Sequence, residues 1–427
     1  MSNYQLIKNT EWKEVEINGE LKEIPSDWSI FKLSSLVKRS ITKGTTPTTI
    51  GFSFLDKGDV KFFKVEHLKE DKILPTNIFI NNQCNEKMKR SQLEENDLLF
   101  SIAGTIGNVA KVKKDDLPAN INQAIAIIRF KNINDLDYTK FYIKNYVEKI
   151  TKNTLTGVIP NFNLEMLENI EIPYPNKEQS AIASILSEQE SVIENIEQLI
   201  QKYESRFQYL SDELLSGRLR VKELDGEMVL YKNPDDNWKE VEINGEMKEI
   251  PSDWENSTPK KLNFSIKTGK KDANAAKENG KYPFFTCSSN EILSIDTYVF
   301  DTEAILISGN GSTLGEVRYY KGKFDAYQRT YVIDNIKNIF YMNLYFKKYF
   351  RESLNIIGGS IPFIKLGDIE NFNILIPKEN EISLIVSILT QQENLIDEQK
   401  QMLQQEKQKF NWFLDNLLSG KYLIKEN

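Results

Sequence analysis

The feature that most constrains the fold is a long apolar repeat that occurs twice in the chain. From Glu178 to Ser216, apolar residues recur every three or four positions and no proline or glycine intervenes before Gly217. This pattern predicts one helix of roughly 58 Å. Its start (Ser184-Ile185-Leu186) and stop (Leu214-Leu215-Ser216-Gly217) return 203 residues later, at Ser387 and Leu417. Two such helices favour an antiparallel pair, with the intervening segments at opposite ends of the rod.

The apolar face of each predicted helix is wider than a strict heptad seam, so each helix is expected to pack against more than one neighbour. Gln189 and Gln392 share one heptad position, where a buried amide can set the register of a coiled coil. The predicted coil and partner-docking residues are Ile182, Leu186, Gln189, Ile193, Ile196, Ile200 and Phe207 in the first helix, and Ile385, Leu389, Gln392, Ile396, Leu403 and Phe410 in the second.

A second repeat divides the chain into two halves of like plan. Residues 12–28 return as residues 238–254, and only Leu21 against Met247 differs. Asn18-Gly19 and Asn244-Gly245 lie between alternating residues, which predicts a two-residue hairpin in each copy. We interpret the repeated segment as a structural clip that leads into a domain, and a binding role stays open.

These repeats predict an α+β fold, in which two mixed α/β blocks are joined by a pair of long antiparallel coiled-coil helices in a pseudo-two-fold repeat. Strands are expected at 60–65, 97–102, 121–130 and 169–172 of the first block, with a helix near 138–150. The predicted segments are a leader (1–28), a first block (29–175), a central helix (176–217), a linker with the second leader (218–254), a second block (255–377), a distal helix (378–420) and a tail (421–427).

The two blocks share a framework and differ in their loops. Two correspondences show this. The segment Leu98–Ser101 and the glycine loop after it correspond to Ile305–Ser308 and its own glycine loop, and the segment Asn120–Gln123 corresponds to Asp325–Gln328. A third correspondence joins residues 156–160 to residues 358–362. Similar frameworks with different loops suggest related tasks on different targets.

The charge of the chain is unevenly distributed. Its net charge is -7, but residues 29–175 hold 21 basic and 17 acidic residues and residues 255–377 hold 16 and 13. The blocks are therefore mildly basic (+4 and +3), while the excess of acidic residues lies in the helices and leaders. This distribution allows the blocks to contact phosphate.

The sequence shows no recognisable catalytic motif, and we predict neither catalytic residues nor a metal site. His67 is the only histidine, and the glycine-rich loop at 309–315 lacks the Gly-Lys-Ser/Thr ending of a phosphate loop. The cysteines Cys84 and Cys287 are too few for a disulfide framework, and no membrane span or signal peptide is predicted. We expect a cytoplasmic recognition protein.

The order of motifs resembles the specificity subunit of type I restriction-modification systems over nearly the whole chain. The matching residues are the leader LKEIPSDW, the turn Lys43–Pro47, the loop Gly104–Gly107, Asn122-Gln123 and the run IEIPYPNKEQSAIASIL at the first helix. The corresponding run in the second half is FNILIPKENEISLIVSIL. It lacks the Glu-Gln pair that usually precedes the helix in this family.

The resemblance implies that the blocks are target recognition domains, each reading one half of a split, asymmetric site in double-stranded DNA. It implies partners as well: two methyltransferase (M) subunits and restriction (R) subunits, which would use S-adenosylmethionine, ATP and Mg²⁺, with no cofactor in this chain. The alternatives are a coiled-coil scaffold that does not bind DNA and, less well supported, an enzyme with an undetected site.

Residues for DNA contact are predicted from side-chain chemistry, since lysine and arginine suit phosphates and Asn, Ser and Thr suit base edges. They are Lys43, Thr45, Lys61, Lys64, Arg90, Thr105 and Asn108 in the first block, and Lys270, Lys271, Asn310, Ser312, Arg318 and Arg329 in the second. Gln123 and Gln328 fall in apolar strand contexts, where they could read a base or satisfy buried backbone.

Overall fold

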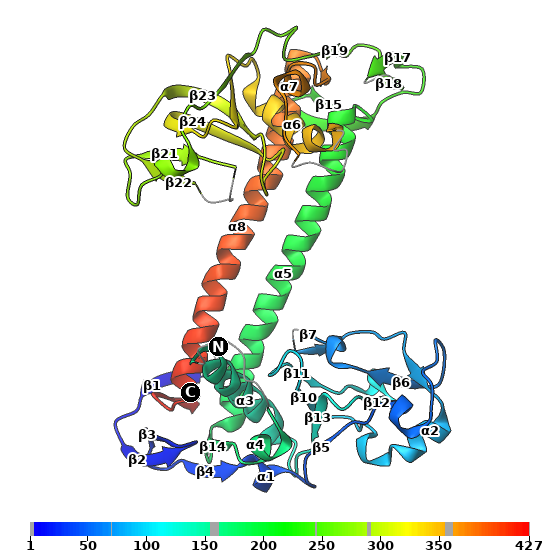
Figure 1. Ribbon diagram of the computed structural model, residues 1–427. Helices are drawn as coiled ribbons and strands as arrows, with labels where there is room; N and C mark the ends of the chain where they lie inside the picture. Colours follow the sequence, from blue (N-terminus) through cyan, green and yellow to red (C-terminus); the bar gives the residue numbers. More distant parts are fainter. Residues whose placement is uncertain are drawn as a thin grey trace. The chain divides into compact units, whose positions relative to one another are not determined.

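The computed structural model describes residues 4–69, 71–153, 162–243, 246–287, 292–354 and 362–426. The chain forms two compact units: the first comprises Met1–Glu197 with Met402–Asn427, and the second Gln198–Gln401. Each unit contains one leader, one block and half of each long helix (Figure 1). The predicted correspondence 156–160 with 358–362 lies outside the described residues, apart from Pro362.

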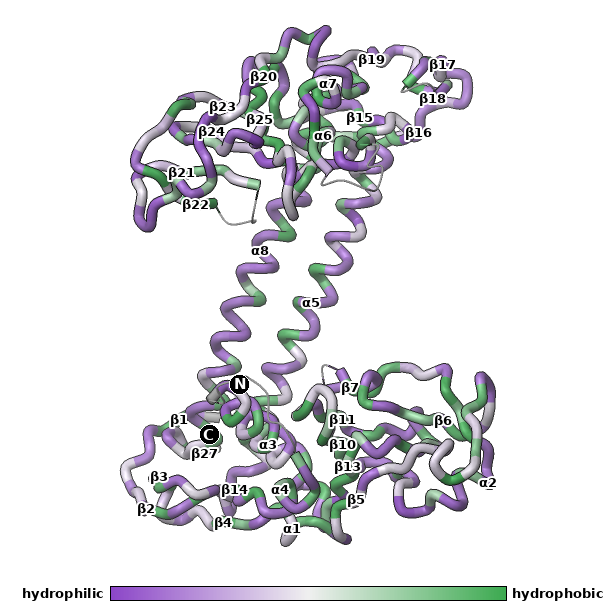
Figure 2. The backbone as a smooth tube through the Cα atoms, in the orientation of Figure 1, coloured by the Kyte–Doolittle hydropathy of each residue, from purple (hydrophilic) through white to green (hydrophobic). Residues whose placement is uncertain are grey.

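The two predicted long helices are present as α5 (Gln179–Ser216) and α8 (Glu379–Leu417). Both are followed by a glycine with positive φ, Gly217 at 75° and Gly420 at 70°, which is the left-handed conformation that ends many helices. Their middle stretches are mostly hydrophilic, with isolated apolar residues (Figure 2).

The helices run antiparallel in each unit, as predicted. In the first unit Lys407 of α8 pairs with Glu197 of α5 at 2.7 Å, and Gln189 donates a hydrogen bond to Glu406. In the second unit Lys400 pairs with Glu204 at 2.7 Å. Early residues of one helix thus meet late residues of the other, and the Gln189 amide faces the partner helix.

The described part of the first block contains two sheets of three or more strands and the short pair β7–β8. One has the order β11-β10-β13-β5 and the other β12-β6-β9, with β12 parallel to β6. Short helices α1 (Leu33–Leu36), α2 (Asn82–Lys87) and α4 (Leu164–Glu168) and the longer α3 (Asn134–Asn153) surround them. The strands are β5 (Thr42–Lys43), β6 (Val60–Phe63), β7 (Leu68–Lys69), β8 (Lys72–Ile73), β9 (Phe79–Ile80), β10 (Leu98–Ser101), β11 (Val109–Lys111), β12 (Ala119–Ile121) and β13 (Ile125–Ile128).

The second block repeats this arrangement in one six-stranded sheet of order β20-β25-β23-β24-β21-β22. Its strand β24 (Val317–Ala326) is continuous, whereas the first block divides the same path between β11 and β12. Helices α6 (Ile339–Ser353) and α7 (Leu366–Glu370) correspond to α3 and α4. The other strands are β20 (Ser265–Thr268), β21 (Tyr282–Phe285), β22 (Leu293–Ile295), β23 (Phe300–Ser308) and β25 (Thr330–Asp334).

A repeated tyrosine contact joins each block to the strand that precedes its long helix. The Tyr138 hydroxyl donates to the Pro173 carbonyl at 2.6 Å, and the Tyr341 hydroxyl donates to the Leu375 carbonyl at 2.7 Å. These carbonyls lie in β14 (Glu171–Tyr174), which pairs with β4 (Ser29–Lys32), and in β26 (Ile374–Ile376), which pairs with β19 (Glu255–Ser257).

One strand prediction was wrong in its extent. The run 121–130 was expected to form a single strand, but it ends β12 at Ile121 and begins β13 at Ile125, in different sheets. The chain turns at 122–124 because Ala124 N–H bonds the Asn122 side chain while Asn122 N–H bonds the Phe63 carbonyl at 3.1 Å. The turn therefore belongs to the junction of the two sheets.

The leaders form the predicted hairpins, β2 (Trp12–Ile17) with β3 (Glu20–Pro25) and β17 (Trp238–Ile243) with β18 (Glu246–Pro251). Asn18 has φ 54° and hydrogen-bonds Glu171 of β14 through both backbone and side chain, at 2.7–2.9 Å. The first hairpin is thus a structural clip. Asn244 and Gly245 lie outside the described residues.

Each unit closes with another strand pair after the long helix. In the second unit this is a hairpin of β15 (Leu219–Leu224) and β16 (Glu227–Lys232). In the first unit the same pair is made by the two ends of the chain, β27 (Tyr422–Glu426) and β1 (Tyr4–Lys8) (Figure 1). Gly217 and Gly420 precede the pairs, so β15 and β27 are equivalent strands.

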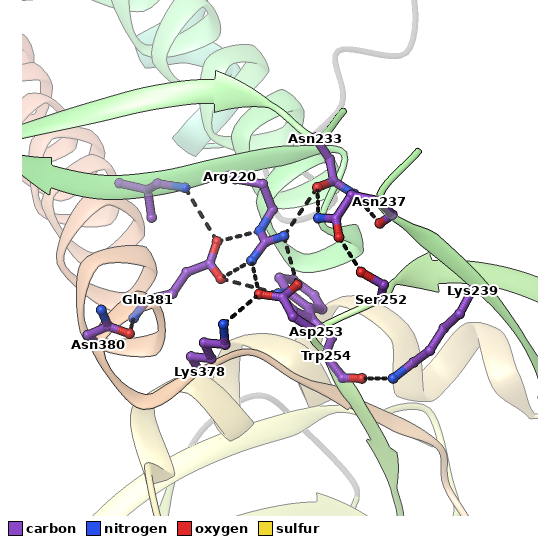
Figure 3. Close-up of polar contacts among 11 residues, drawn as sticks. Arg220, Asn233, Asn237, Lys239, Ser252, Asp253, Trp254, Lys378, Asn380 and Glu381 are labelled. Atoms are coloured by element: carbon purple, nitrogen blue, oxygen red, sulfur yellow. Dashed lines mark hydrogen bonds and ion pairs between the residues drawn. The ribbon is translucent and has the colours of Figure 1, made fainter. Parts of the chain in front are cut away.

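A buried ion cluster secures this junction in the second unit (Figure 3). The guanidinium of Arg220, on β15, bonds both oxygens of Glu381 at 2.7 Å and both oxygens of Asp253 at 3.0–3.1 Å. Arg220 and Glu381 are 4–5% exposed, and the Trp254 indole donates to Glu381 at 3.2 Å. Burial opposes ionisation of Arg220, but the two carboxylates outweigh it and raise its pKa.

The first unit keeps the acids of this cluster and lacks the arginine. Leu423 occupies the place of Arg220, while Glu178, Asp27 and Trp28 correspond to Glu381, Asp253 and Trp254. Glu178 accepts a hydrogen bond from the Ile424 N–H at 3.1 Å. Burial, assisted by the charge of Asp27, raises the pKa of Glu178 from its ordinary 4.5 despite that bond.

Because the folded-state pKa of Glu178 is raised, its contribution to stability is present below the unfolded pKa and is lost as the pH rises through the folded pKa. We therefore expect Glu178→Gln, which keeps the acceptor oxygen, to slow hydrogen exchange of β27 amides at about pH 7 and to have little effect at about pH 4. Glu381→Gln should have the opposite effect on β15, because it weakens a satisfied ion pair. Faster exchange of β27 in Glu178→Gln at neutral pH would refute this explanation.

Candidate nucleic-acid interface

Strand ends of the first block converge on one polar edge. Lys43, at the end of β5, pairs with Ala126 near the start of β13, and Ile102 N–H at the end of β10 bonds the Ala124 carbonyl at 2.9 Å. The end of β6 meets the same turn through the Phe63 carbonyl. The first polar edge, as we call it, is formed by Lys43, Thr45, Lys64, Thr105 and Gln123.

A glycine makes this convergence possible. A Cβ on Gly44 would lie 2.0 Å from the Ile121 carbonyl oxygen and 2.4 Å from that of Asn122, so no side chain fits between the strand ends. In the second block, Gly269 follows β20, and its Cβ would lie 1.7 Å from the Ala326 carbonyl oxygen. The same close approach is built twice.

Some side chains of the first polar edge are held by contacts within the chain, and others are exposed to solvent. Lys43, Thr105 and Gln123 are exposed, and Thr45 and Lys64 are half-buried. The Lys64 ammonium lies 5.0 Å from the ring centroid of Phe54, and the Thr46 hydroxyl donates to the Gln123 side chain. The ring and the hydroxyl orient these two side chains at the edge.

Three other predicted residues of the first block are placed differently. Lys61 lies toward the other end of β6 and β12, where its ammonium bonds the Asp115 carbonyl. Arg90 is exposed, and its carbonyl accepts from Thr42 at 3.1 Å at the start of β5. Asn108 lies in the β10–β11 turn near the edge, but its amide donates to the Leu68 carbonyl at 2.8 Å.

The second block builds the second polar edge from the equivalent strand ends. Tyr327 N–H bonds the Phe285 carbonyl at 2.9 Å, as Asn122 bonds Phe63 in the first block, and Gly309 N–H bonds the Arg329 carbonyl at 2.8 Å. Gln328 N–H bonds the Lys271 carbonyl at 2.9 Å. The edge brings together Lys270, Lys271, Asn310, Ser312, Gln328 and Arg329.

The second polar edge is the more basic one. Lys270 and Arg329 are exposed, and the Arg329 guanidinium lies 5.8 Å from the ring centroid of Phe363. Burial raises the pKa of Asp325, and the nearby charge of Lys271 opposes this rise. Arg318 lies on β24, half-buried, where it pairs with Glu316 at 3.0 Å.

The structure resolves the open question about the two glutamines. Both Gln123 and Gln328 are exposed, so they do not satisfy buried backbone. Gln328 donates to Asp272 at 3.5 Å, and Gln123 accepts from Thr46. Neither glutamine is among the predicted contact residues, although their shared position after an apolar strand in both blocks is a sequence signal for a common role.

The predicted coil residues are covered within the chain. Ile182, Leu186 and Gln189 are 0–3% exposed in the first unit, and Ile385, Leu389 and Gln392 are 0–6% exposed in the second. Ile196, Ile200 and Ile396 are buried, and Ile193, Phe207, Leu403 and Phe410 are half-buried. A partner could reach most of these only by displacing part of this chain, because they fill the two cores and the helix seam.

The outer surface of the helices presents other apolar side chains. Val192, Tyr209, Met402 and Trp412 are 42–58% exposed.

The two glutamines that share a heptad position differ in their contacts. Gln189 bonds Glu406, whereas the Gln392 carbonyl oxygen has no hydrogen-bond partner within the described part of the chain.

The described ranges contain neither a candidate metal cluster nor a membrane-spanning helix. Across them, no group of three or more His, Cys, Asp or Glu residues is arranged to hold a metal ion. His67 lies in a local turn, where its Nδ1 accepts the Lys64 N–H at 3.0 Å. No helix in the described segments is long and apolar enough to cross a membrane.

Comparison with known proteins identifies the family. Residues 25–205 and 251–407 match the type I restriction modification DNA specificity domain. The EcoDI specificity subunit of Escherichia coli is 41% identical over 142 residues, covering 33% of this chain and 31% of that protein. The MjaIX specificity subunit of Methanocaldococcus jannaschii is 27% identical over 429 residues, covering 92% of each chain.

Solved structures show the same architecture. The crystal structure of the type I restriction-modification S subunit from M. genitalium superposes with a TM-score of 0.56 at 17% identity, covering 94% of this chain and 97% of that one. The α+β plan of two mixed blocks joined by paired antiparallel helices is therefore confirmed. The two copies of the specificity domain, each ending in a long helix, show that the chain belongs to the type I restriction-modification DNA specificity family.

Proposed function

We propose that this chain is the sequence-reading subunit of a type I restriction-modification complex, and that each block reads one half of a bipartite, asymmetric DNA site. The observation that carries the proposal is the doubled polar edge: one framework, with a glycine at the same crossing, presents different side chains in the two blocks. A rigid frame with variable side chains at its edge suits recognition of two different half-sites.

The chemistry of the edges supports DNA as the ligand. Lysine and arginine at both edges can contact phosphates, and the exposed amides of Gln123 and Gln328 can form paired hydrogen bonds with an adenine edge. The family assignment favours this function over a coiled-coil scaffold that does not bind DNA. Steeply salt-dependent binding to duplex DNA would separate the two further.

The long helices would set the distance between the half-sites, since α5 continues without interruption for 38 residues.

We propose that this subunit is not itself catalytic. Two methyltransferase subunits and the restriction subunits would supply S-adenosylmethionine, ATP and Mg²⁺ chemistry. The isolated chain should then transfer no methyl group to DNA that contains the site.

We expect Gln328→Ala to relax base preference at one position of one half-site, with a loss of about 1–3 kcal/mol of discrimination. Gln123→Ala should do the same in the other half-site. Competition binding of the assembled complex with duplexes that carry single base changes measures both effects. Gln201→Ala, an exposed glutamine on α5, is the control and should leave preference unchanged. Unaltered base preference in both edge variants would count against readout by these amides.

A further inference from the structure

The two leader hairpins have outward faces whose sequence the fold does not explain. Their inner residues have a structural reason, because Ile24, Trp28, Ile250 and Trp254 are 0–2% exposed in the two cores. The outward faces nevertheless match almost residue for residue, although the blocks that follow them have diverged. The acidic hairpin faces, as we call them, are Glu14, Glu16, Leu21 and Glu23 in the first unit and Glu240, Glu242, Met247 and Glu249 in the second.

The strand register brings like charges together on both faces. Glu14 lies directly opposite Glu23, and Glu240 lies directly opposite Glu249. Like charges directly opposite in an antiparallel pair destabilise it, so the same unfavourable pair is present twice. Beside each pair is an exposed apolar side chain, Leu21 (68% exposed) or Met247 (62%). An apolar centre ringed by glutamates is suited to a partner surface of opposite charge.

A cavity lies beside the first hairpin, with Glu23 of the acidic face in its lining. Its volume is about 200 Å³, and its lining includes Lys22, Glu23, Tyr142, Tyr146, Lys149 and Asp415. The rings of Tyr142 and Tyr146 are stacked, with an interplanar angle of 5°. Asp415 is already paired with Lys149 at 2.7 Å, so a lysine or arginine entering the cavity would be attracted by Glu23 and the tyrosine rings. The second unit repeats the tyrosine pair as Tyr345 and Tyr349, whose centroids are 4.8 Å apart.

The charge of the hairpins points to protein and away from DNA. Each leader segment, 12–28 and 238–254, holds two lysines and five acidic residues, which repel a phosphate backbone. Both lysines of the first segment are occupied, Lys13 by the Trp28 carbonyl and Lys22 by Glu20 at 2.8 Å. The near-identity of the two faces indicates two copies of one partner.

We propose that the two acidic hairpin faces dock two copies of the same protein, each through a basic surface with an apolar centre. The inference rests on the proposed function, in which that protein is the methyltransferase subunit. It supplies an exposed docking surface, which the covered apolar rows of α5 and α8 do not. Leu21 or Met247 enters an apolar depression of the partner, and its lysines or arginines meet the surrounding glutamates.

The test uses the full chain and the methyltransferase subunit, with bound copies counted by native mass spectrometry. The wild-type chain should bind two copies, Glu14→Lys with Leu21→Asp should leave one, and adding Glu240→Lys with Met247→Asp should leave none. Each altered face should bind at least about tenfold more weakly. Glu14→Lys faces Glu23 and creates an attractive pair, so the hairpin is kept. Leu21→Met, which gives the first face the sequence of the second, is the matched control and should bind two copies.

Two results would overturn the inference: two copies retained by the chain with both faces altered, or no methyltransferase subunit bound by the wild-type chain. Failure of the proposed function gives a different result. In that case the number of bound copies falls from two to one to none as described, while the wild-type complex shows no preference for any duplex sequence.

Discussion

Replacing Arg220 by leucine is expected to lower the free energy of unfolding of the second unit by about 3–5 kcal/mol, since two carboxylates lose the cation that they share. Glu381 is 5% exposed, and its two carboxylate oxygens accept hydrogen bonds from Nε and Nη2 of Arg220, both at 2.7 Å. Leucine is the residue that the first unit carries at this position, Leu423, so its shape suits the strand pair. Hydrogen exchange of β15 and β16 amides measures the effect locally.

The same variant should alter acid stability in a defined direction. Burial alone would raise the pKa of Asp253, but its bonds to Arg220 and Lys378 outweigh this and lower the pKa below 3.8. Stability from Asp253 is therefore present above the unfolded pKa and is lost as the pH falls through the folded value. Without Arg220 this loss should begin at higher pH.

Arg218→Leu is the matched control on the same strand end. Its guanidinium pairs with Glu213 at 2.9 Å but is 54% exposed, so the change should cost less than about 1 kcal/mol. Equal effects of the Arg218 and Arg220 variants would show that the buried cluster has no special part in stability.

Gly269→Ala is expected to abolish recognition by the second block. The added methyl would lie 1.7 Å from the Ala326 carbonyl oxygen and 2.7 Å from that of Tyr327, so β20 must move away from the β24 turn. We expect a loss of about 2–4 kcal/mol in stability of the block and displacement of Lys270, Lys271 and Gln328. Binding competition should show that the preference for one half-site is lost and that for the other is kept.

Gly367→Ala provides the control for this change. Gly367 lies in α7 of the same block, and its Cβ would meet only the Asn371 side chain, at 3.7 Å. Alanine favours a helix, so stability should stay the same or rise slightly. If Gly269→Ala kept both half-site preferences, the close approach at Gly269 would not position the second polar edge.

The sequence predicted the parts of the fold that have long or repeated patterns. The two helices were clear because their period persists for ten turns without a breaker, and the hairpins because Asn-Gly turns separate alternating residues. Antiparallel pairing followed from the chain order of the two halves. The family resemblance, carried by motifs that occur in the same order in both halves, was confirmed by the domain match.

Other features depend on contacts between distant segments, which pattern alone does not reveal. The run 121–130 is mostly apolar, and its polar pair Asn122-Gln123 did not by itself mark the turn, which the distant Phe63 carbonyl stabilises. The exposure of Gln123 and Gln328 arises at that turn. The missing arginine of the first unit is a single difference, Leu423 against Arg220, and its effect appears only when the buried carboxylates around it are known.

The apolar rows of the helices were expected to dock partners, and the structure covers them with the chain's own blocks and helix seam. Periodicity identifies an apolar face but does not say what packs on it. The domain boundaries and the individual DNA contacts stay predictions, which the variants above address residue by residue.

The most direct test of one block per half-site is to map methylated bases in DNA modified by the assembled complex, before and after residues 255–377 are replaced by the corresponding block of a relative. The account predicts that one half of the bipartite site changes while the other half and the gap between them stay the same. A pattern in which both halves change, or neither does, would contradict it.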